Sequence, residues 1–584
     1  MNQRFNPLFL VFLCFFTIGF GPIFGQKITR NPYLQEVSPK SITIRYRTDL
    51  PTPSQIQYSL NPTTFKLAKN TNSGNQTEHI IKIDSLEPNR TYYYKIIASP
   101  TTTLGDSTYF FKTAPNPGSK DKFSVWCIGD MYPGTTQLNV YEGFKKFNKN
   151  KYTNLFLTVG DNVYGGGTDD DFQANFFKVY ENGPLLKQSP LFTSIGNHDY
   201  DAYQKNQDNP DMAYFQNFSL PINGQSGGLA SNSEAYYSFD YANTHFICLD
   251  SYAWGKDNMR IFDGPSEQLA WLKNDLKANK HPWTIVYFHY PPYTKGTYDS
   301  DIVPELTKLR EILTPVFDEF NVDMVISGHS HVFERSRPLK GLIGPSAEFS
   351  KKNNWTQNSS GKYDKSDNSC PFIFQTNPKE KNGVLYVVNG VGGATGSPRA
   401  GFPHPAMEYS LAGKGGSFYF EIENKRLDAK FIDEDGQVQD QFTIMKDFKP
   451  RDPISQTINY LDKIEIAASW QGEYVWSTGE KVASLKVGPT EKSIFTVSDP
   501  QGCFQEKFEI NVNAPLSIQQ VKEEINDAFD SLLIYNMLGQ KIKEFPEKGH
   551  ISKRITQELN PGLYLFLIEK DGIQRVLKIE ISSF

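Results

Sequence analysis

The sequence is poor in cysteine and has no excess of either charge. Its five cysteines are spread over all 584 residues, too few and too scattered for a disulfide framework or a thiolate metal cluster. Any metal must therefore be held by other side chains. The net charge is −5 and no long block of one sign occurs, which excludes a dedicated surface for binding DNA or RNA. Nucleic acid could still be a substrate.

Long apolar runs are also scarce. One run begins at Leu8 and extends to Phe16, but Gly19, Gly21 and Pro22 interrupt its continuation and leave it short of the ~20 apolar residues that a membrane-spanning helix needs. With Arg4 ahead of it, the run resembles a secretory signal peptide over residues 1–25, cleaved after Gly25. We therefore expect a secreted or cell-surface protein with no transmembrane segment in its mature form.

The composition is that of a folded globular protein, with 38% hydrophobic and 14% aromatic residues. At about 150 residues per domain, the length predicts roughly four domains. Over residues 26–117, short alternating strands predict a β-sandwich. Leu86-Glu-Pro88, followed by Tyr92, resembles the tyrosine corner of fibronectin type III domains. We interpret this part as an accessory domain without catalytic residues.

Residues 118–447 follow a different pattern, in which apolar, β-branched runs alternate with helical periodicity. Such alternation predicts an α/β unit whose strands are largely buried. The expected runs are strands at 123–128, 155–159, 191–195, 284–288, 324–326, 384–389, 417–422, 429–432 and 442–445, and helices at 168–180, 268–278 and 304–320. The predicted fold class is thus multidomain, with β-sheets flanked by helices at the centre and all-β modules at both ends.

Two β modules are predicted after the central unit. Residues 448–514 resemble the immunoglobulin-like modules of bacterial surface proteins, through motifs such as Tyr474-Val-Trp476. Residues 515–584 resemble the C-terminal sorting domain of type IX secretion cargo in Bacteroidetes, through Leu533-Ile-Tyr535 and Asn560-Pro-Gly562. This resemblance implies the type IX secretion machinery as a partner and the surface of a Gram-negative bacterium as the location.

Five short motifs in the central unit each follow an apolar strand. They are Gly129-Asp130, Gly160-Asp161-Asn162-Val163-Tyr164, Gly196-Asn197-His198-Asp199, Val286-Tyr-Phe-His289 and Gly328-His329-Ser330-His331. The carboxyl ends of strands are the edge at which open α/β sheets build their sites, and a glycine in four motifs permits a sharp turn there. A single motif of this kind is more often a helix cap or a surface pair. Five in series, with complementary ligand types, predict a two-metal site.

The segment from Lys120 to about Met445 resembles the calcineurin-like metallophosphoesterases and, within them, the purple acid phosphatases. In the general superfamily the first motif is Asp-x-His, whereas Asp130-Met131-Tyr132 lacks this histidine. The second motif instead carries Tyr164, three residues after Asp161. Loss of the imidazole and gain of a phenol is the purple acid phosphatase pattern.

The resemblance implies two metal sites that share Asp161 as a bridge. The first ligand set is Asp130, Asp161, Tyr164 and His331, and the second is Asp161, Asn197, His289 and His329. Two carboxylates and a phenolate suit a hard trivalent ion such as Fe(III), whereas imidazoles and an amide suit Zn(II), Fe(II) or Mn(II). The implied activity is hydrolysis of phosphate monoesters by metal-hydroxide attack, on small phosphorylated substrates.

His198 is adjacent to Asn197 and is not a ligand in the family pattern. The resemblance implies that it contacts the phosphate and protonates the leaving alkoxide, and the alternative is that it supports a ligand. Tyr298 stands where many family members have a phosphate-binding histidine, so we expect Asn197, His198 and Tyr298 to contact substrate. A neutral phenol donates a hydrogen bond but carries no imidazolium charge.

Two other functions remain open from the sequence. The same site could belong to a phosphodiesterase or a nucleotidase. The ratio of turnover on para-nitrophenyl phosphate to turnover on bis-para-nitrophenyl phosphate would distinguish these from a phosphomonoesterase. From a different class, the chain could be a surface adhesion protein with a degraded phosphatase domain. The presence of the whole ligand set argues against that alternative.

Overall fold

The computed structural model describes residues 26–200, 209–252, 260–262, 265–449, 451, 453–513, 528–551, 555 and 557–581, with the backbone alone at 66–73. The predicted signal peptide over 1–25, which includes Cys14, lies outside the described residues. Among the helices that are described, none has the length and apolar character needed to cross a membrane.

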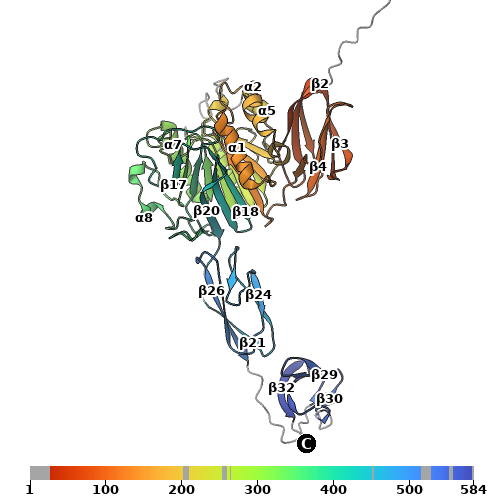
Figure 1. The fold of residues 1–584 in the computed structure, drawn as a ribbon. Coiled ribbons are helices and arrows are strands. Elements are labelled where there is room, and N and C mark those ends of the chain that lie inside the picture. The colour runs from red at the N-terminus through yellow and green to blue at the C-terminus, as the bar shows by residue number, and fades with distance from the viewer. Residues whose placement is uncertain are drawn as a thin grey trace, which may run out of the picture.

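The N-terminal part is a six-stranded antiparallel sheet (Figure 1). Its strands are β1 (Ile28–Gln35), β2 (Ile42–Asn61), β3 (Thr64–Ile83), β4 (Thr91–Ile97), β5 (Thr103–Leu104) and β6 (Phe110–Lys112). The Glu87 N–H donates to the Tyr92 hydroxyl at 3.0 Å, which is the kind of bond that a tyrosine corner makes.

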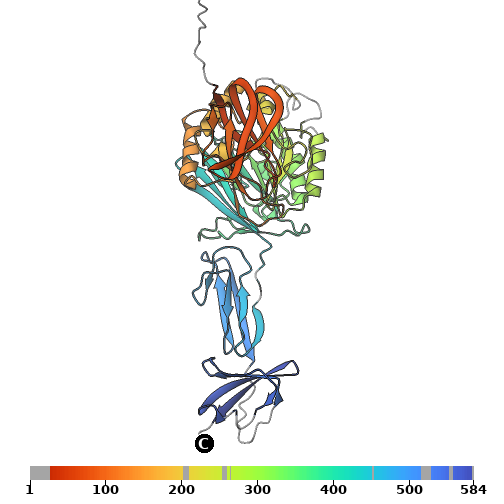
Figure 2. The ribbon, with the colours of Figure 1, turned by 90° about the vertical axis from the view of Figure 1, so that its right-hand side faces the viewer.

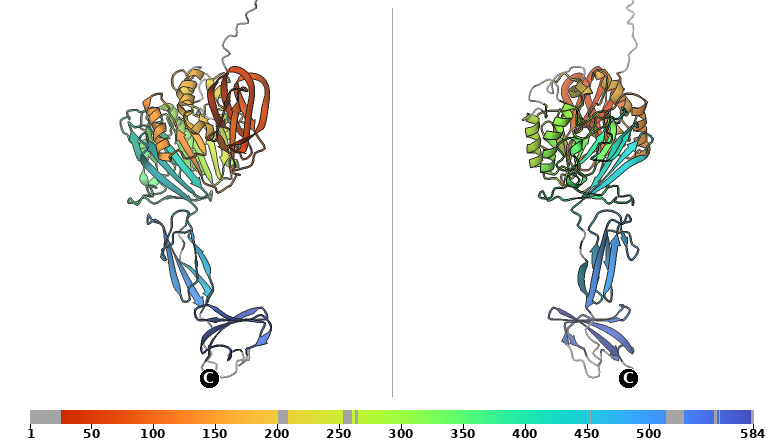
Figure 3. Two further views of the ribbon diagram at one scale, coloured as in Figure 1. Left: turned by 45° about the vertical axis from the view of Figure 1, so that its right-hand side comes forward. Right: turned by 90° about the vertical axis from the view of Figure 1, so that its left-hand side faces the viewer.

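This N-terminal sheet is bound firmly to the central unit (Figure 3). The buried Arg30 guanidinium donates to Asp169 at 2.9 Å, and the Tyr33 hydroxyl donates to the Asn217 carbonyl at 2.6 Å. A buried charge is stable only when it is paired and hydrogen-bonded, so these contacts fix the mutual orientation of the two parts.

The central unit contains two seven-stranded sheets. The first, in the order β15-β20-β19-β18-β7-β8-β9, comprises β7 (Phe123–Ile128), β8 (Leu155–Val159), β9 (Leu191–Ser194), β15 (Phe372–Phe374), β18 (Gly416–Glu423), β19 (Arg426–Asp433) and β20 (Val438–Lys446). The second, in the order β10-β11-β12-β13-β16-β14-β17, comprises β10 (Tyr237–Tyr241), β11 (Thr244–Cys248), β12 (Trp283–Tyr287), β13 (Met324–Ser327), β14 (Val332–Ser336), β16 (Leu385–Asn389) and β17 (Met407–Ala412). Strands β7 to β9 are parallel, as are β11, β12, β13 and β16.

Helices cover the outer faces of these sheets (Figure 1). The helical elements are α1 (Thr135–Asn148), α2 (Asp169–Phe172), the π-helix η1 (Gln173–Phe177), α3 (Lys178–Tyr180), α4 (Leu185–Gln188), the 3₁₀ turn η2 (His198–Tyr200), α5 (Ala213–Asn217), α6 (Glu267–Ala278), α7 (Pro304–Phe320), the 3₁₀ turn η3 (Ser346–Glu348) and α8 (Lys351–Asn354). The predicted helix at 168–180 is therefore a run of α2, η1 and α3, with one turn widened to π geometry.

The strands of the second sheet are buried on both faces because each face has its own partner. On β11, Phe246 and Cys248 face the core shared with the first sheet, whereas Ile247 packs with the residues of α6 and α7. Alternate residues of a strand point to opposite faces, so a strand covered on both sides is mainly apolar. This explains why the sequence shows runs rich in apolar and β-branched residues here.

The module after the central unit shares a core with it. Its strands are β21 (Ile454–Asn459), β22 (Ile464–Ala467), β23 (Val475–Trp476), β24 (Ser484–Val487), β25 (Ser493–Ser498) and β26 (Gln505–Asn513). Met445 and Phe448 pack with Trp470 and Phe504 in one apolar cluster.

A disulfide joins Cys370 of the central unit to Cys503 of this module, across 133 residues of sequence. The expectation that the cysteines are too scattered to form a disulfide framework thus missed a single long-range bond. Cys127 and Cys248 are buried free thiols in the sheets.

The last module has its own core (Figure 2). Its strands are β27 (Ala528–Phe529), β28 (Ser531–Asn536), β29 (Lys541–Phe545), β30 (Gly549–His550), β31 (Gly562–Lys570) and β32 (Ile573–Ile581). Phe529, Leu532 and Phe566 are among its buried side chains, and every residue of this cluster lies within the module.

A buried charge cluster, outside the predicted site, surrounds His245 of β11. The His245 ring nitrogens lie 2.7 Å from Asp240 Oδ1 and 2.7 Å from Asp275 Oδ2. His281 Nε2 lies 3.3 Å from the other oxygen of Asp240. Burial opposes the charged imidazole, but its hydrogen bonds to Asp240 and Asp275 and the charges of these carboxylates outweigh burial and raise the pKa of His245 to about 9.

This cluster predicts a loss of stability in alkali. The pKa of an unfolded histidine is about 6.5, so the stabilisation by His245 is complete below about pH 6.5 and disappears as pH rises through 9, a change of up to about 3 kcal/mol. Urea unfolding followed by tryptophan fluorescence should show a smaller loss between pH 6 and pH 9.5 in His245→Gln than in the wild type. Equal pH dependence in both proteins would contradict this assignment.

Candidate metal centre

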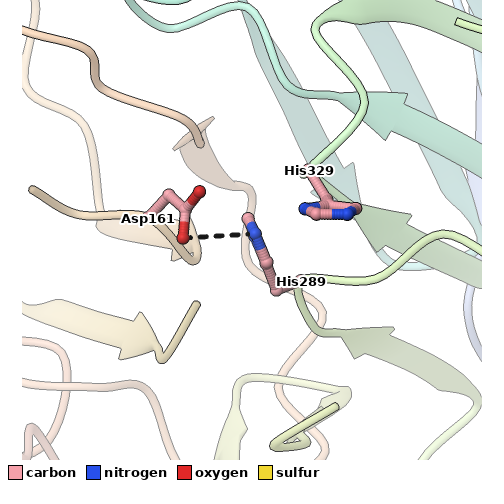
Figure 4. Close-up of side chains that lie close together, drawn as sticks. All are labelled: Asp161, His289 and His329. Atoms are coloured by element: carbon pink, nitrogen blue, oxygen red, sulfur yellow. Dashed lines mark ion pairs between the residues drawn. The ribbon is translucent and has the colours of Figure 1, made fainter. Parts of the chain in front are cut away.

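The five predicted motifs lie at the carboxyl ends of five parallel strands. Asp130 follows β7, Asp161 follows β8, Asn197 follows β9, His289 follows β12 and His329 follows β13. Because the two sheets pack face to face, the ends of both parallel sets meet at one edge. Figure 4 shows Asp161, His289 and His329 converging from separate loops.

The backbone at this edge is held in an unfavourable conformation at three of these positions. Asp130, Asp161 and His329 have positive φ angles of 56°, 48° and 64°. Each such residue costs of the order of 1 kcal/mol and persists only where the surroundings enforce it. The His329 N–H donates to Asp130 Oδ2 at 2.8 Å, and the Met131 N–H donates to the Asp161 carbonyl at 3.1 Å. The motif loops therefore hold one another in place.

The glycines of the motifs serve mainly for close approach. Of the four, only Gly160 has a positive φ, at 87°. A Cβ atom on Gly196 would lie 2.1 Å from the Asp161 nitrogen, and one on Gly328 would lie 2.4 Å from Asp130 Oδ2. The prediction that these glycines permit a sharp turn is thus right for Gly160, while Gly196 and Gly328 leave room for the neighbouring carboxylate loops.

A first group of donor atoms consists of Asp130, Tyr164 and His331. The Tyr164 hydroxyl lies 3.4 Å from Asp130 Oδ1 and 3.3 Å from His331 Nε2, and His331 Nε2 lies 3.4 Å from Asp130 Oδ1. Burial raises the pKa of Tyr164 strongly, and the charges of Asp130 and Asp161 raise it further. A phenolate here would therefore require an additional positive charge among these three groups.

A second group consists of Asp161, Asn197, His289 and His329. His289 Nε2 lies 3.2 Å from Asp161 Oδ1 and 3.1 Å from Asn197 Oδ1. Asp161, His289 and His329 offer ligand atoms that all lie within 4.8 Å of one another, and all three side chains are buried.

The protonation of His289 shows what this second group lacks. His289 Nδ1 lies 2.9 Å from the Val159 carbonyl, which can only accept, so this nitrogen carries the proton. In neutral His289 the Nε2 lone pair then faces two oxygen acceptors. Burial disfavours a charged ring, but the charge of Asp161 outweighs this and raises the pKa of His289 to about 9. Either a proton on Nε2 or a metal ion would supply positive charge at this point, and a metal ion fits this arrangement of donors.

The predicted substrate contacts border both groups. The His198 backbone N–H donates to Asp161 Oδ1 at 2.9 Å, and its ring centroid lies 4.3 Å from that of Tyr164. The Tyr298 ring stacks on His329, with centroids 3.9 Å apart and planes inclined by 14°. Asn197 and His198 are partly exposed, so they lie between the buried donors and solvent. The structure thus brings together every residue that the sequence assigns to the site.

One residue of the motifs received no role from the sequence. Asp199 is buried and accepts hydrogen bonds from Asn162 Nδ2 at 2.8 Å and from the Gly196 N–H at 2.8 Å. Burial, followed by the charge of Asp161, raises its pKa to about 7. Asp199 ties the second motif to the third and is a positioning residue. Its place directly after Asn197 and His198 is the signal that could have revealed it.

A buried carboxylate also braces the loop that carries Tyr298. Glu334 Oε2 accepts from the Thr294 hydroxyl at 2.5 Å, and Glu334 Oε1 accepts from the His404 N–H at 3.3 Å. Thr294 and Ser330 are joined by a further hydrogen bond of 2.8 Å. These bonds connect the β12 loop to the loop of His329.

Comparison with known proteins places this site in a family. Residues 123–333 match the model of the calcineurin-like phosphoesterase family. This part of the chain is a calcineurin-like phosphoesterase domain. The curated relatives include purple acid phosphatase 21 of Arabidopsis thaliana, 29% identical over 45% of this chain and 54% of that protein. They also include phosphoenolpyruvate phosphatase of Allium cepa, 26% identical over 50% of this chain and 59% of that protein.

The fold is also that of a solved structure. A purple acid phosphatase from yellow lupin (Lupinus luteus) seeds superposes with a TM-score of 0.53 at 18% identity, covering 71% of this chain and 74% of that one. The chain spans about half the length of the curated relatives it matches. The purple acid phosphatases are thus relatives of the phosphoesterase domain.

Proposed function

We propose that the chain is a secreted, binuclear-metal acid phosphatase that hydrolyses phosphate monoesters. The observation that carries this proposal is the pair of donor groups at one edge of a phosphoesterase domain, where Asp161, His289 and His329 offer ligand atoms within 4.8 Å of one another. The resemblance to purple acid phosphatases supports a phosphoester as the substrate.

The donor chemistry supports two different metals. Asp130, Tyr164 and His331, with Asp161, would hold Fe(III), because two carboxylates and a phenolate neutralise a trivalent ion. The second set of Asp161, Asn197, His289 and His329 carries fewer charges and suits Zn(II), Fe(II) or Mn(II). When bound, the two ions would supply positive charge that stabilises the phosphate oxygens and acidifies the attacking water.

The chain's own residues would perform the remaining steps. The His198 imidazole is partly exposed beside Tyr164, where it can protonate the leaving oxygen as general acid. The Tyr298 hydroxyl can donate a hydrogen bond to the phosphate. The stacking of Tyr298 on His329 fixes the position of this phenol.

A substrate panel with metal analysis tests the function. Purified protein should contain about two metal ions per chain, at least one of them iron, and should hydrolyse para-nitrophenyl phosphate in preference to its bis ester at acid pH. Preference for the bis ester would make the chain a phosphodiesterase. A metal-free protein that is inactive on both esters would fit the adhesion alternative.

We propose that the last module is a secretion signal read by the type IX machinery. Its core is separate from the other clusters of the described residues, so its removal should leave the phosphatase intact. Deleting residues 515–584 should keep the activity of purified protein within about two-fold while abolishing its appearance outside the native cell. Normal export of the truncated chain would overturn the sorting role, and an inactive truncated chain would show that the module braces the enzyme.

A further inference from the structure

A loop between β16 and β17 brings an arginine to the edge of the metal centre. The Gly396 N–H donates to the His331 carbonyl at 3.2 Å, and the Arg399 N–H donates to the Gly296 carbonyl at 2.7 Å. A Cβ atom on Gly396 would lie 1.9 Å from Thr297 Cγ2, so the two loops pack without space for a side chain. This loop is therefore fixed against the segment that carries Tyr298.

The Arg399 guanidinium is bound through Nε, and the residue is exposed to solvent. Its Nε–H donates to the Thr297 carbonyl at 2.8 Å, directly before Tyr298 in the sequence. The residue is exposed, and its remaining guanidinium nitrogens form no ion pair with the part of the chain that the structure describes. The nearby Lys295 is different, because it is bound by Asp299 at 2.9 Å and by Asp301 at 3.0 Å.

The order of the side chains runs outward from the metal centre. His329 is buried, Tyr298 stacks on it and is half-buried, and Arg399 is exposed beyond them. The bond from Arg399 Nε–H to the Thr297 carbonyl holds the guanidinium beside the segment that carries this phenol.

We propose that Arg399, together with Tyr298, forms an anion-binding subsite for a second anionic group of the substrate. This inference rests on the proposed phosphatase function and extends it to a substrate class, namely phosphomonoesters or anhydrides whose leaving group carries a phosphate or a carboxylate. A guanidinium with free N–H groups binds such oxyanions in a bidentate manner. Arg399 also supplies a positive charge that the neutral phenol of Tyr298 does not.

The test compares three substrates in the full metal-loaded protein. The Arg399→Ala variant should lose about 10- to 100-fold in kcat/KM for pyrophosphate and for phosphoglycolate, the range that one charge-assisted hydrogen bond supplies. The leaving group of para-nitrophenyl phosphate carries neither a phosphate nor a carboxylate, so the loss of kcat/KM for this substrate should stay within about two-fold. Loss for pyrophosphate alone would assign the subsite to phosphate, and loss for phosphoglycolate alone would assign it to carboxylate.

Two controls separate charge from loop structure. Arg399→Lys keeps the charge but loses the paired N–H groups, so it should retain only part of the preference for anionic substrates. Lys340→Ala removes an exposed cation beside Asp318 and should change nothing. Added salt should lower the preference in the wild type but not in Arg399→Ala. Equal loss for all three substrates, or no loss, would overturn the subsite. A wild type that hydrolyses none of them would overturn the proposed function and the subsite with it.

Discussion

Replacing Asp161 by asparagine should lower the turnover of phosphate monoesters by about 10⁴-fold, equal to about 5 kcal/mol in the activation free energy. Asp161 is buried, and its Oδ1 lies 3.2 Å from His289 Nε2 while it accepts from the His198 N–H at 2.9 Å. An amide has the same shape but lacks the negative charge that both proposed metal sites share. We therefore expect the variant to lose at least one metal ion per chain.

Metal analysis and turnover should change together in this variant. Asp170→Asn is the matched control, because Asp170 is an exposed carboxylate on α2, in the same connection after β8. It should keep both metals and full activity. An Asp161→Asn protein with normal metal content and normal turnover would contradict the bridging role.

Much of this site can be predicted from the sequence, for a physical reason. Parallel strands buried on both faces must be mainly apolar, so β7, β8 and β12 appear as clear runs of apolar, aromatic and β-branched residues. The polar motif after each run is then placed at the carboxyl edge by the direction of the chain alone. The prediction that Asp130, Asp161 and His289 meet at one edge needs no knowledge of the loops.

The long-range contacts are not contained in such local patterns. The Cys370–Cys503 bond joins a loop of the central unit to the following module, and neither cysteine lies in a recognisable spacing. His245 is another case, because its two carboxylate partners come from β10 and from α6 and meet only in the folded chain. In both cases only the tertiary fold brings these residues together, because neither helical nor strand periodicity in the sequence relates them.

The motif glycines and Asp199 show a second limit of prediction from sequence, which concerns the role that a correctly identified motif residue plays. A glycine after a strand predicts a turn, but at Gly196 and Gly328 the space is filled by the neighbouring aspartate loops. Asp199 accepts hydrogen bonds from two motifs at once, which is visible only when both loops are in place. The sequence identifies which residues meet, and the structure shows which of them hold the others.

His198→Ala should retain the metals but lose turnover according to the leaving group. The contact with Asp161 is made by the His198 backbone N–H at 2.9 Å, so alanine preserves it and removes only the ring beside Tyr164. An alkyl alkoxide needs a proton in order to leave, and we expect a loss of about 10²- to 10⁴-fold for alkyl phosphates. Para-nitrophenolate leaves with little protonation, and its ester should lose less than about 10-fold.

The dependence on the leaving group distinguishes acid catalysis from support of a ligand. Because Asn197 is adjacent to His198, a ring that only braced this ligand would affect metal content and all esters alike. Steady-state kinetics on para-nitrophenyl phosphate and on an alkyl phosphate, with metal analysis of the same samples, separate the two roles. His550→Ala, which changes an exposed ring on β30, is the control. An equal loss for both esters would assign His198 to positioning. A loss confined to the ester with the poor leaving group would establish His198 as the proton donor, because only that role depends on the basicity of the departing oxygen.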